Sequence, residues 1–145
     1  MTTLRIHFRL EQDEDGYPPV AAESVWAQPG LIPGQYVIDN VPFFVREATV
    51  GDTVSAQEED GLRWFSSLIS RSRNSLVRIV FFDKSRVKAT SEHLVAMGCS
   101  TEYLREHSLM AVSVPAEVAL ADVQAYLQSE ADSGSIDYEE PILRQ

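Results

Sequence analysis

The stretch Ser75-Leu-Val-Arg-Ile-Val-Phe-Phe-Asp83 decides the fold that we expect for this chain. Between its two ends the stretch is apolar and largely β-branched or aromatic, and Arg78 is the one polar interruption. Apolar runs of this length are typical of strands that are covered on both faces, because half-exposed strands alternate apolar and polar residues. The pattern therefore predicts a central strand, preceded by antiparallel sheet and followed by helices that alternate with strands.

The chain before this strand has the pattern of short strands separated by turns. Apolar residues alternate with Arg5, His7 and Arg9 in residues 4–10, which indicates a half-buried strand with these three side chains on its polar face. Further extended runs are predicted at residues 20–27, 35–39, 43–45, 53–56 and 62–69. Strands at a spacing of roughly ten residues, with turn signals between them, predict a curled antiparallel sheet or a small barrel.

The chain after the central strand predicts two helices. The first is capped by Thr90 or Ser91 and ends at Gly98. The second has an apolar stripe that starts at Val118 or Leu120, and it ends at Ser133-Gly134. A short helical turn is expected at residues 101–104, a strand at 109–114 and an edge strand at 136–143. The order strand, helix, strand, helix, strand predicts an α+β fold with both helices on one face of the sheet.

A chain of 145 residues with 44% hydrophobic content is long enough to form one compact core. We therefore expect a single domain over residues 1–145, with a β-rich half (1–74) and an α/β half (75–145). Five large or central apolar side chains are expected to be largely buried: Trp26, Phe81, Phe82, Val114 and Leu127.

The net charge of −10 is unevenly distributed along the sequence. Residues 1–61 carry 3 basic and 11 acidic side chains, residues 62–88 carry 7 and 1, and residues 89–145 carry 2 and 10. Such a surface repels nucleic-acid phosphates and favours association with a basic protein. We expect no nucleic-acid partner, no membrane association and a cytoplasmic location, since no signal segment or long apolar span is present in the sequence.

The acidic segment Glu11–Gly16 resembles the start of a calcium-binding loop, with acidic residues at alternate positions and glycine at the sixth. The twelfth position of such a loop holds Ala22 instead of glutamate, and Pro18-Pro19 interrupt the segment. A turn at Asp15-Gly16 is the better interpretation. We expect no metal site and no cofactor.

The sequence offers few groups for catalysis. Cys99 precedes a predicted helical turn, but nothing in the sequence brings His93 or His107 to it, and a lone cysteine after glycine is typical of core packing. The acidic pairs Glu58-Glu59 and Glu139-Glu140 are predicted in turn or edge positions, where adjacent side chains diverge. Motifs for acyl transfer, phosphate binding and dinucleotide binding are also absent from the sequence. We therefore expect no catalytic residues and a protein that is not an enzyme.

Several motifs together resemble a bacterial family known as a domain of unknown function. They are D-G-x-P-P-V at residues 15–20, E-S-V-W-A at 23–27, N-x-P-F-F at 40–44 and G-D at 51–52. The resemblance continues through Val77-Arg78, residues 112–115 and residues 137–140. These motifs are structural in kind and imply no catalytic residue.

Small acidic bacterial proteins include many immunity proteins, which neutralise toxins delivered between competing cells. By analogy with this class, we expect a non-enzymatic immunity protein or antitoxin that occludes a basic cleft on its cognate toxin. The expected partner-binding residues lie in two acidic turns, Asp13-Glu14-Asp15 and Glu58-Glu59-Asp60. The alternative is a binding or regulatory module for a cellular protein or a small ligand.

Overall fold

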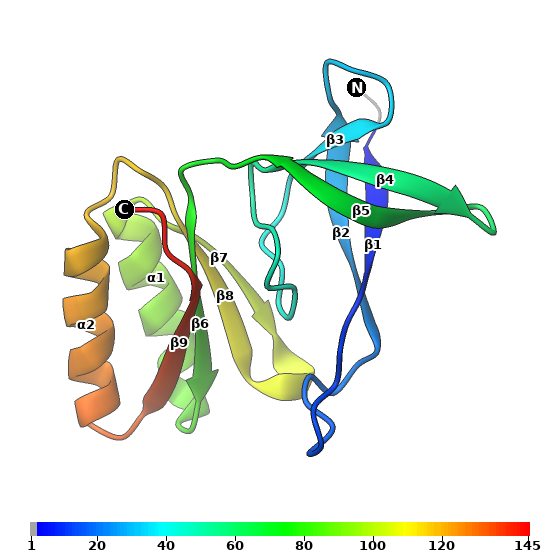
Figure 1. The fold of residues 1–145 in the computed structure, drawn as a ribbon. Coiled ribbons are helices and arrows are strands. Elements are labelled where there is room, and N and C mark those ends of the chain that lie inside the picture. Colours follow the sequence, from blue (N-terminus) through cyan, green and yellow to red (C-terminus); the bar gives the residue numbers. More distant parts are fainter. Residues whose placement is uncertain (1–2) are drawn as a thin grey trace. The chain divides into compact units, whose positions relative to one another are not determined.

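The computed structural model describes residues 3–145 and divides the chain into two compact units (Figure 1). The described part of the N-terminal unit is residues 3–72, and the C-terminal unit is residues 73–145. The boundary lies two residues before the expected change from β-rich to α/β chain. Within residues 3–145, no helix is both long enough and apolar enough to cross a membrane.

The N-terminal unit is a closed five-stranded barrel, as the turn spacing predicted. Its strands follow one another around the barrel, and each pairs antiparallel with the next. A parallel bridge between His7 and Trp64 joins the first strand to the fifth. The strands are β1 (Leu4–Arg9), β2 (Ala22–Pro29), β3 (Gln35–Ile38), β4 (Thr53–Glu59) and β5 (Leu62–Ser70).

The expected strand at residues 43–45 is wrong, because these residues lie in the connection between β3 and β4. The Glu23 carboxylate accepts the backbone N–H groups of Phe43, Phe44 and Val45, at 2.6, 2.8 and 3.0 Å. These are the donors that a strand would offer to a neighbouring strand. Residues 43–45 of the connection are thus anchored by a side chain of β2 and not by sheet pairing.

The barrel core is formed by alternate residues of the strands, as a period of two requires. Ile6, Phe8, Val25, Ala27, Ile38 and Val54 are buried in one cluster, together with Val45 and Ala48 from the β3–β4 connection. Trp26 lies between two of these inward positions on β2 and is 43% exposed. The expectation that Trp26 is buried is therefore wrong.

The C-terminal unit is a four-stranded antiparallel sheet in the order β7-β8-β6-β9. Its strands are β6 (Ser75–Phe81), β7 (Ser100–Leu104), β8 (Leu109–Val114) and β9 (Ile136–Ile142), and its helices are α1 (Val87–Met97) and α2 (Leu120–Asp132). The expected central strand is confirmed, since β6 pairs with β8 on one side and β9 on the other. The β-α-β-β-α-β connectivity with this strand order is the ferredoxin-like arrangement, and both helices cover one face of the sheet (Figure 1).

Two local predictions for this unit are corrected. Residues 101–104 belong to strand β7 and not to a helical turn, because Thr101 and Tyr103 pair with Val112 and Met110 on β8. Helix α1 begins at Val87, earlier than the expected Thr90 or Ser91. Its end at Gly98 is confirmed: Gly98 has a φ of 109°, and a Cβ atom there would lie 2.8 Å from Val118 Cγ2.

The core of the C-terminal unit lies between the sheet and the two helices. Phe81 is 3% exposed, and Val114 and Leu127 are fully buried, as expected. Phe82, by contrast, is 67% exposed. Strand β6 ends at Phe81, so Phe82 follows the last inward position and its side chain lies outside the core.

Candidate protein-binding surface

The tip of the β4–β5 hairpin presents one of the two acidic turns. Asp60 and Gly61 have φ angles of 55° and 80°, which is the two-residue turn with two left-handed positions that suits a tight hairpin. Within residues 3–145, the exposed Glu58 and Asp60 side chains make no hydrogen bond or ion pair, while Glu59 Oε2 accepts from Arg9 Nη2 at 3.1 Å. The tip therefore offers two available carboxylates on a fixed scaffold.

The other acidic turn lies in the β1–β2 connection, and its three acidic residues differ in role. Asp13 Oδ1 accepts the backbone N–H groups of Asp15 and Tyr17, both at 2.9 Å, so this carboxylate organises the turn itself. Gly16 N–H donates to the Asp13 carbonyl, and the predicted chain reversal at Asp15-Gly16 is present. The exposed Glu14 and Asp15 side chains have no hydrogen-bond or ion-pair partner in the described part of the chain.

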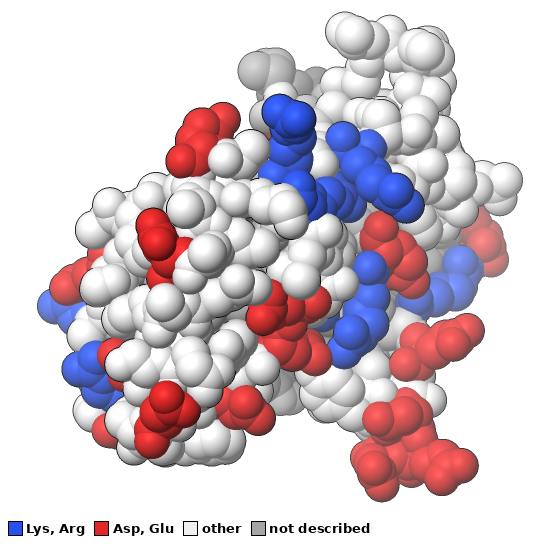
Figure 2. Space-filling model, turned by 60° about the vertical axis from the view of Figure 1, so that its left-hand side comes forward, with Lys and Arg blue, Asp and Glu red and all other residues white. Residues whose placement is uncertain are grey.

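The structure does not bring the two acidic turns together. Figure 1 places them apart on the N-terminal unit, one at the end of the β1–β2 pair and one at the tip of the β4–β5 hairpin. On the face drawn in Figure 2, acidic side chains form separate groups with basic side chains among them. On the N-terminal unit the two acidic turns are thus separate local features and not one continuous patch.

A row of stacked cationic and aromatic side chains runs along the outside of the barrel. We call Arg5, His7, Arg9, Trp26 and Trp64 the Arg–Trp ribbon. The Arg5 guanidinium carbon lies 4.2 Å from the Trp26 ring centroid, and that of Arg9 lies 3.9 Å from Trp64. The His7 and Trp64 rings are 5.5 Å apart between centroids. Through the Arg9–Glu59 ion pair, the ribbon continues to the acidic hairpin tip.

Strand register explains the ribbon. Arg5 pairs with Trp26 across β1 and β2, and His7 pairs with Trp64 across β1 and β5, so alternating outward residues of three strands lie side by side. The sequence pattern places Arg5, His7 and Arg9 on a polar face, but it assigns Trp26 to the core and does not assign Trp64 to either face of its predicted strand. The ribbon forms only because β1 pairs with β5. These strands are far apart in sequence, so local sequence patterns cannot predict their pairing.

The ribbon carries less positive charge than its composition suggests. Partial burial, and next the neighbouring charge of Arg5, lower the pKa of His7 below its ordinary value of 6.5. His7 is therefore mostly neutral at pH 7. Glu59 also pairs with Arg9, so within the described residues 3–145 the guanidinium of Arg5 is the main charge of the ribbon without an acidic partner.

An open pocket of about 470 Å³ lies at the β2–β3 connection of the same unit. Residues 29–36 form most of its lining together with Leu4, and Arg63 is its one charged residue. The Arg63 guanidinium carbon lies 5.9 Å from the Tyr36 ring centroid. This lining holds no pair of titratable groups that could act together as acid and base.

The groups considered for catalysis are not brought into a reactive arrangement. Cys99 is buried in the core of the C-terminal unit, and burial raises the pKa of its thiol to about 11. A thiol with such a pKa supplies very little thiolate at pH 7 and is a poor nucleophile. Within residues 3–145, no three His, Cys, Asp or Glu side chains are grouped so that they could hold a metal ion.

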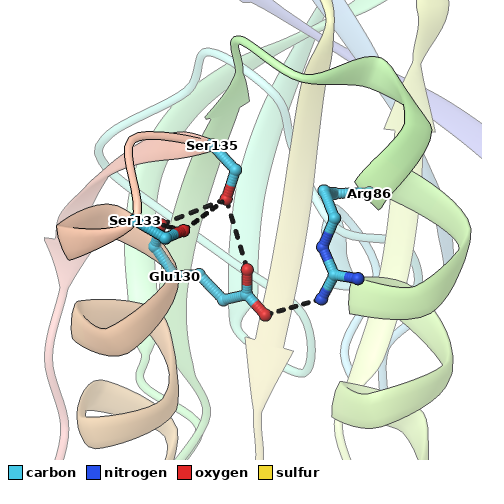
Figure 3. Close-up of polar contacts among 4 residues, drawn as sticks. All are labelled: Arg86, Glu130, Ser133 and Ser135. Atoms are coloured by element: carbon cyan, nitrogen blue, oxygen red, sulfur yellow. Dashed lines mark hydrogen bonds and ion pairs between the residues drawn. The ribbon is translucent and has the colours of Figure 1, made fainter.

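Figure 3 shows a polar cluster that joins the two helices of the C-terminal unit. Arg86 Nη2, just before α1, donates to Glu130 Oε1 on α2 at 2.7 Å, and Ser135 Oγ donates to Glu130 Oε2 at 3.2 Å. Ser133 Oγ donates to the Glu130 carbonyl at 2.7 Å. The hydrogen bond from Arg86 is the main cause that lowers the pKa of Glu130, so this carboxylate is a weak base that fastens the helices together.

The lowered pKa of Glu130 predicts how its contribution to stability depends on pH. Because the pKa is lower in the folded than in the unfolded chain, the contribution is present above the ordinary value of 4.5 and is lost as the pH falls through the folded value. Glu130→Gln should therefore lower the free energy of unfolding at pH 7 and have a smaller effect at pH 3. Urea unfolding of both proteins at the two pH values measures this, with exposed Glu117→Gln as the control. An equal loss of unfolding free energy at both pH values would contradict a lowered pKa of Glu130 in the folded chain.

The fold defines a class of small α+β protein in which a five-stranded barrel precedes a β-α-β-β-α-β unit. Residues 23–138 match the family described as "Domain of unknown function (DUF4265)", so the chain belongs to this family. The match confirms the resemblance seen in the sequence and spans both units.

One solved structure shows the same fold. It is described as "Novel crystal structure of a hypothetical protein from Neisseria gonorrhoeae" and aligns with 100% of this chain and 98% of that chain. The TM-score is 0.78 and the sequence identity is 18%. No curated protein sequence matches the chain.

Proposed function

We propose that the chain is a non-enzymatic immunity protein or antitoxin that binds a bacterial protein toxin and occludes its basic active-site cleft. The β4–β5 hairpin tip is the observation that carries this proposal. It places the exposed Glu58 and Asp60 carboxylates, which lack a partner within residues 3–145, at the end of two paired strands. A projecting tip of this kind can enter a concave site without rearrangement of the barrel.

The charge of the N-terminal unit supports a basic partner. Residues 1–72 contain 11 acidic and 5 basic side chains. An acidic surface of this kind accelerates encounter with a basic cleft and disfavours acidic partners. A toxin that acts on nucleic acid or nucleotides has such a cleft, because its substrate carries phosphates. A stable complex should bury about 1,600 Å² in total.

The test is survival of cells that express a toxin domain, taken first from any toxin gene that neighbours the gene of this chain. We expect protection by the wild-type chain and loss of protection by the double variant Glu58→Lys/Asp60→Asn. Asparagine is chosen at Asp60 because it tolerates the positive φ of 55°, and Glu59 is left unchanged because it pairs with Arg9. The matched control is Glu117→Lys/Glu106→Gln, which makes the same charge change at exposed positions of the C-terminal unit.

The outcomes separate the parts of the proposal. Full protection by a folded hairpin-tip variant would show that the tip is not an essential contact. Failure of the wild-type chain to protect against the toxin would contradict the immunity function itself, and capture of a cellular protein instead would favour a regulatory binding module.

A further inference from the structure

We infer that the Arg–Trp ribbon is the anchor of the partner interface, and that it binds the rim of the toxin cleft through a flat apolar patch and a carboxylate. This inference rests on the proposed function and assigns a second set of residues to it. The hairpin tip would then steer the toxin, while the ribbon would hold it.

Exposure sets Trp26 apart from a structural tryptophan. Its side chain is 43% exposed, whereas its neighbours Val25 and Ala27 are buried in the barrel core. Its backbone makes the structural contacts: its N–H donates to Asn40 Oδ1 at 2.6 Å, and its carbonyl accepts from the Asp39 N–H at 2.8 Å. Part of the residue is therefore open to solvent and available to a partner, although one face of the ring contacts Arg5.

The ribbon is also ordered before any partner arrives. Arg5 Nη1 donates to Ser24 Oγ at 2.9 Å while its guanidinium lies over the Trp26 ring. Arg9 is fixed in the same way between Trp64 and Glu59. Side chains that are already ordered lose less conformational entropy on binding. Tryptophan and arginine are the residue types most enriched among those that dominate binding energy at protein interfaces.

The charge of the ribbon identifies the chemistry of its partner. Among residues 3–145, Arg5 makes one side-chain hydrogen bond, to Ser24, and its other guanidinium N–H groups can reach a carboxylate. The exposed Trp26 ring beside it requires an apolar surface. Because the ribbon and the hairpin tip are joined by the Arg9–Glu59 pair, one partner can contact both.

Single-stranded nucleic acid is the main competing occupant, since barrels with aromatic and cationic side chains bind such strands. Several observations argue against it here. Glu59 neutralises Arg9, His7 is mostly neutral at pH 7, and Glu58 and Asp60 lie at the adjacent tip. A phosphodiester backbone would meet one uncompensated cation and several carboxylates, whereas a protein rim needs only one carboxylate for Arg5.

The experiment measures binding of the purified toxin domain by surface plasmon resonance at two salt concentrations. Trp26→Ala and, separately, Arg5→Gln should each raise the dissociation rate at least about tenfold and change the association rate little. Glu58→Lys/Asp60→Asn should mainly lower the association rate and its salt dependence. The matched control is Phe82→Ala, which removes another exposed aromatic ring, in the C-terminal unit, and should leave both rates unchanged.

Unchanged dissociation rates for both ribbon variants, with the wild-type chain bound, would overturn this inference alone. Absence of binding by the wild-type chain would overturn it together with the proposed function. Two other results would also overturn the inference. One is tight binding of a single-stranded oligonucleotide that Trp26→Ala abolishes, and the other is self-association in sedimentation that Trp26→Ala abolishes. Each would assign the ribbon to that other occupant.

Discussion

Phe81→Ala should lower the free energy of unfolding by about 3–5 kcal/mol, while Phe82→Ala should lower it by less than about 1 kcal/mol. The two phenylalanines are adjacent in sequence but differ in burial, with Phe81 3% and Phe82 67% exposed. Phe81 lies among the residues that the helices cover, and its ring makes an edge contact with Tyr103 at 6.1 Å between centroids. Its removal leaves a cavity, whereas removal of Phe82 leaves none.

Urea unfolding of the two variants and the wild type measures this difference. Because the residue type and the substitution are the same, each variant is the control for the other. Similar stabilities of the two variants would contradict the register of β6, since a shift by one residue exchanges the faces on which Phe81 and Phe82 lie.

Glu23→Ala should lower the free energy of unfolding by about 3 kcal/mol or more, because a charged acceptor contributes about 1.5–3 kcal/mol per hydrogen bond. The carboxylate accepts three consecutive backbone N–H groups, of Phe43, Phe44 and Val45. Its loss would release the β3–β4 connection, which delivers Val45 and Ala48 to the barrel core. Glu23→Gln should cost less, since the amide oxygen still accepts.

Thermal unfolding of Glu23→Ala, with exposed Glu14→Ala as the control, tests this role. Amide hydrogen exchange at residues 43–45 should increase in the Glu23 variant and not in the control. Unchanged exchange at these amides would show that the carboxylate is not what protects them.

Much of the fold could be predicted because it depends on local patterns. The apolar run 75–83 identified β6, the alternation in residues 4–10 identified β1, and Gly98 marked the end of α1. Strand β7 was missed because Thr101 and Tyr103 become a strand through pairing with β8, which the segment itself does not encode. Residues 43–45 were read as a strand because the pattern could not show that Glu23 takes their donors.

The candidate surface was predictable in part. The two acidic turns lie where the sequence placed them, since glycine after aspartate marks such turns. Their unequal roles were not predictable: Asp13 organises its own turn and Glu59 pairs with Arg9, which is far away in sequence. Trp26 was assigned to the core because size favours burial, whereas the period of two on β2 places it outside.

The most direct test of the account is a titration of the toxin's own activity with this protein. The purified toxin domain encoded beside the gene would be mixed with increasing amounts of the wild-type chain, Glu58→Lys/Asp60→Asn or Glu117→Lys/Glu106→Gln. We predict complete inhibition at a one-to-one ratio by the wild-type chain and the control. The hairpin-tip variant should require at least about a tenfold excess, because slower association with the basic cleft weakens the complex. Full toxin activity in the presence of excess wild-type chain would contradict the account.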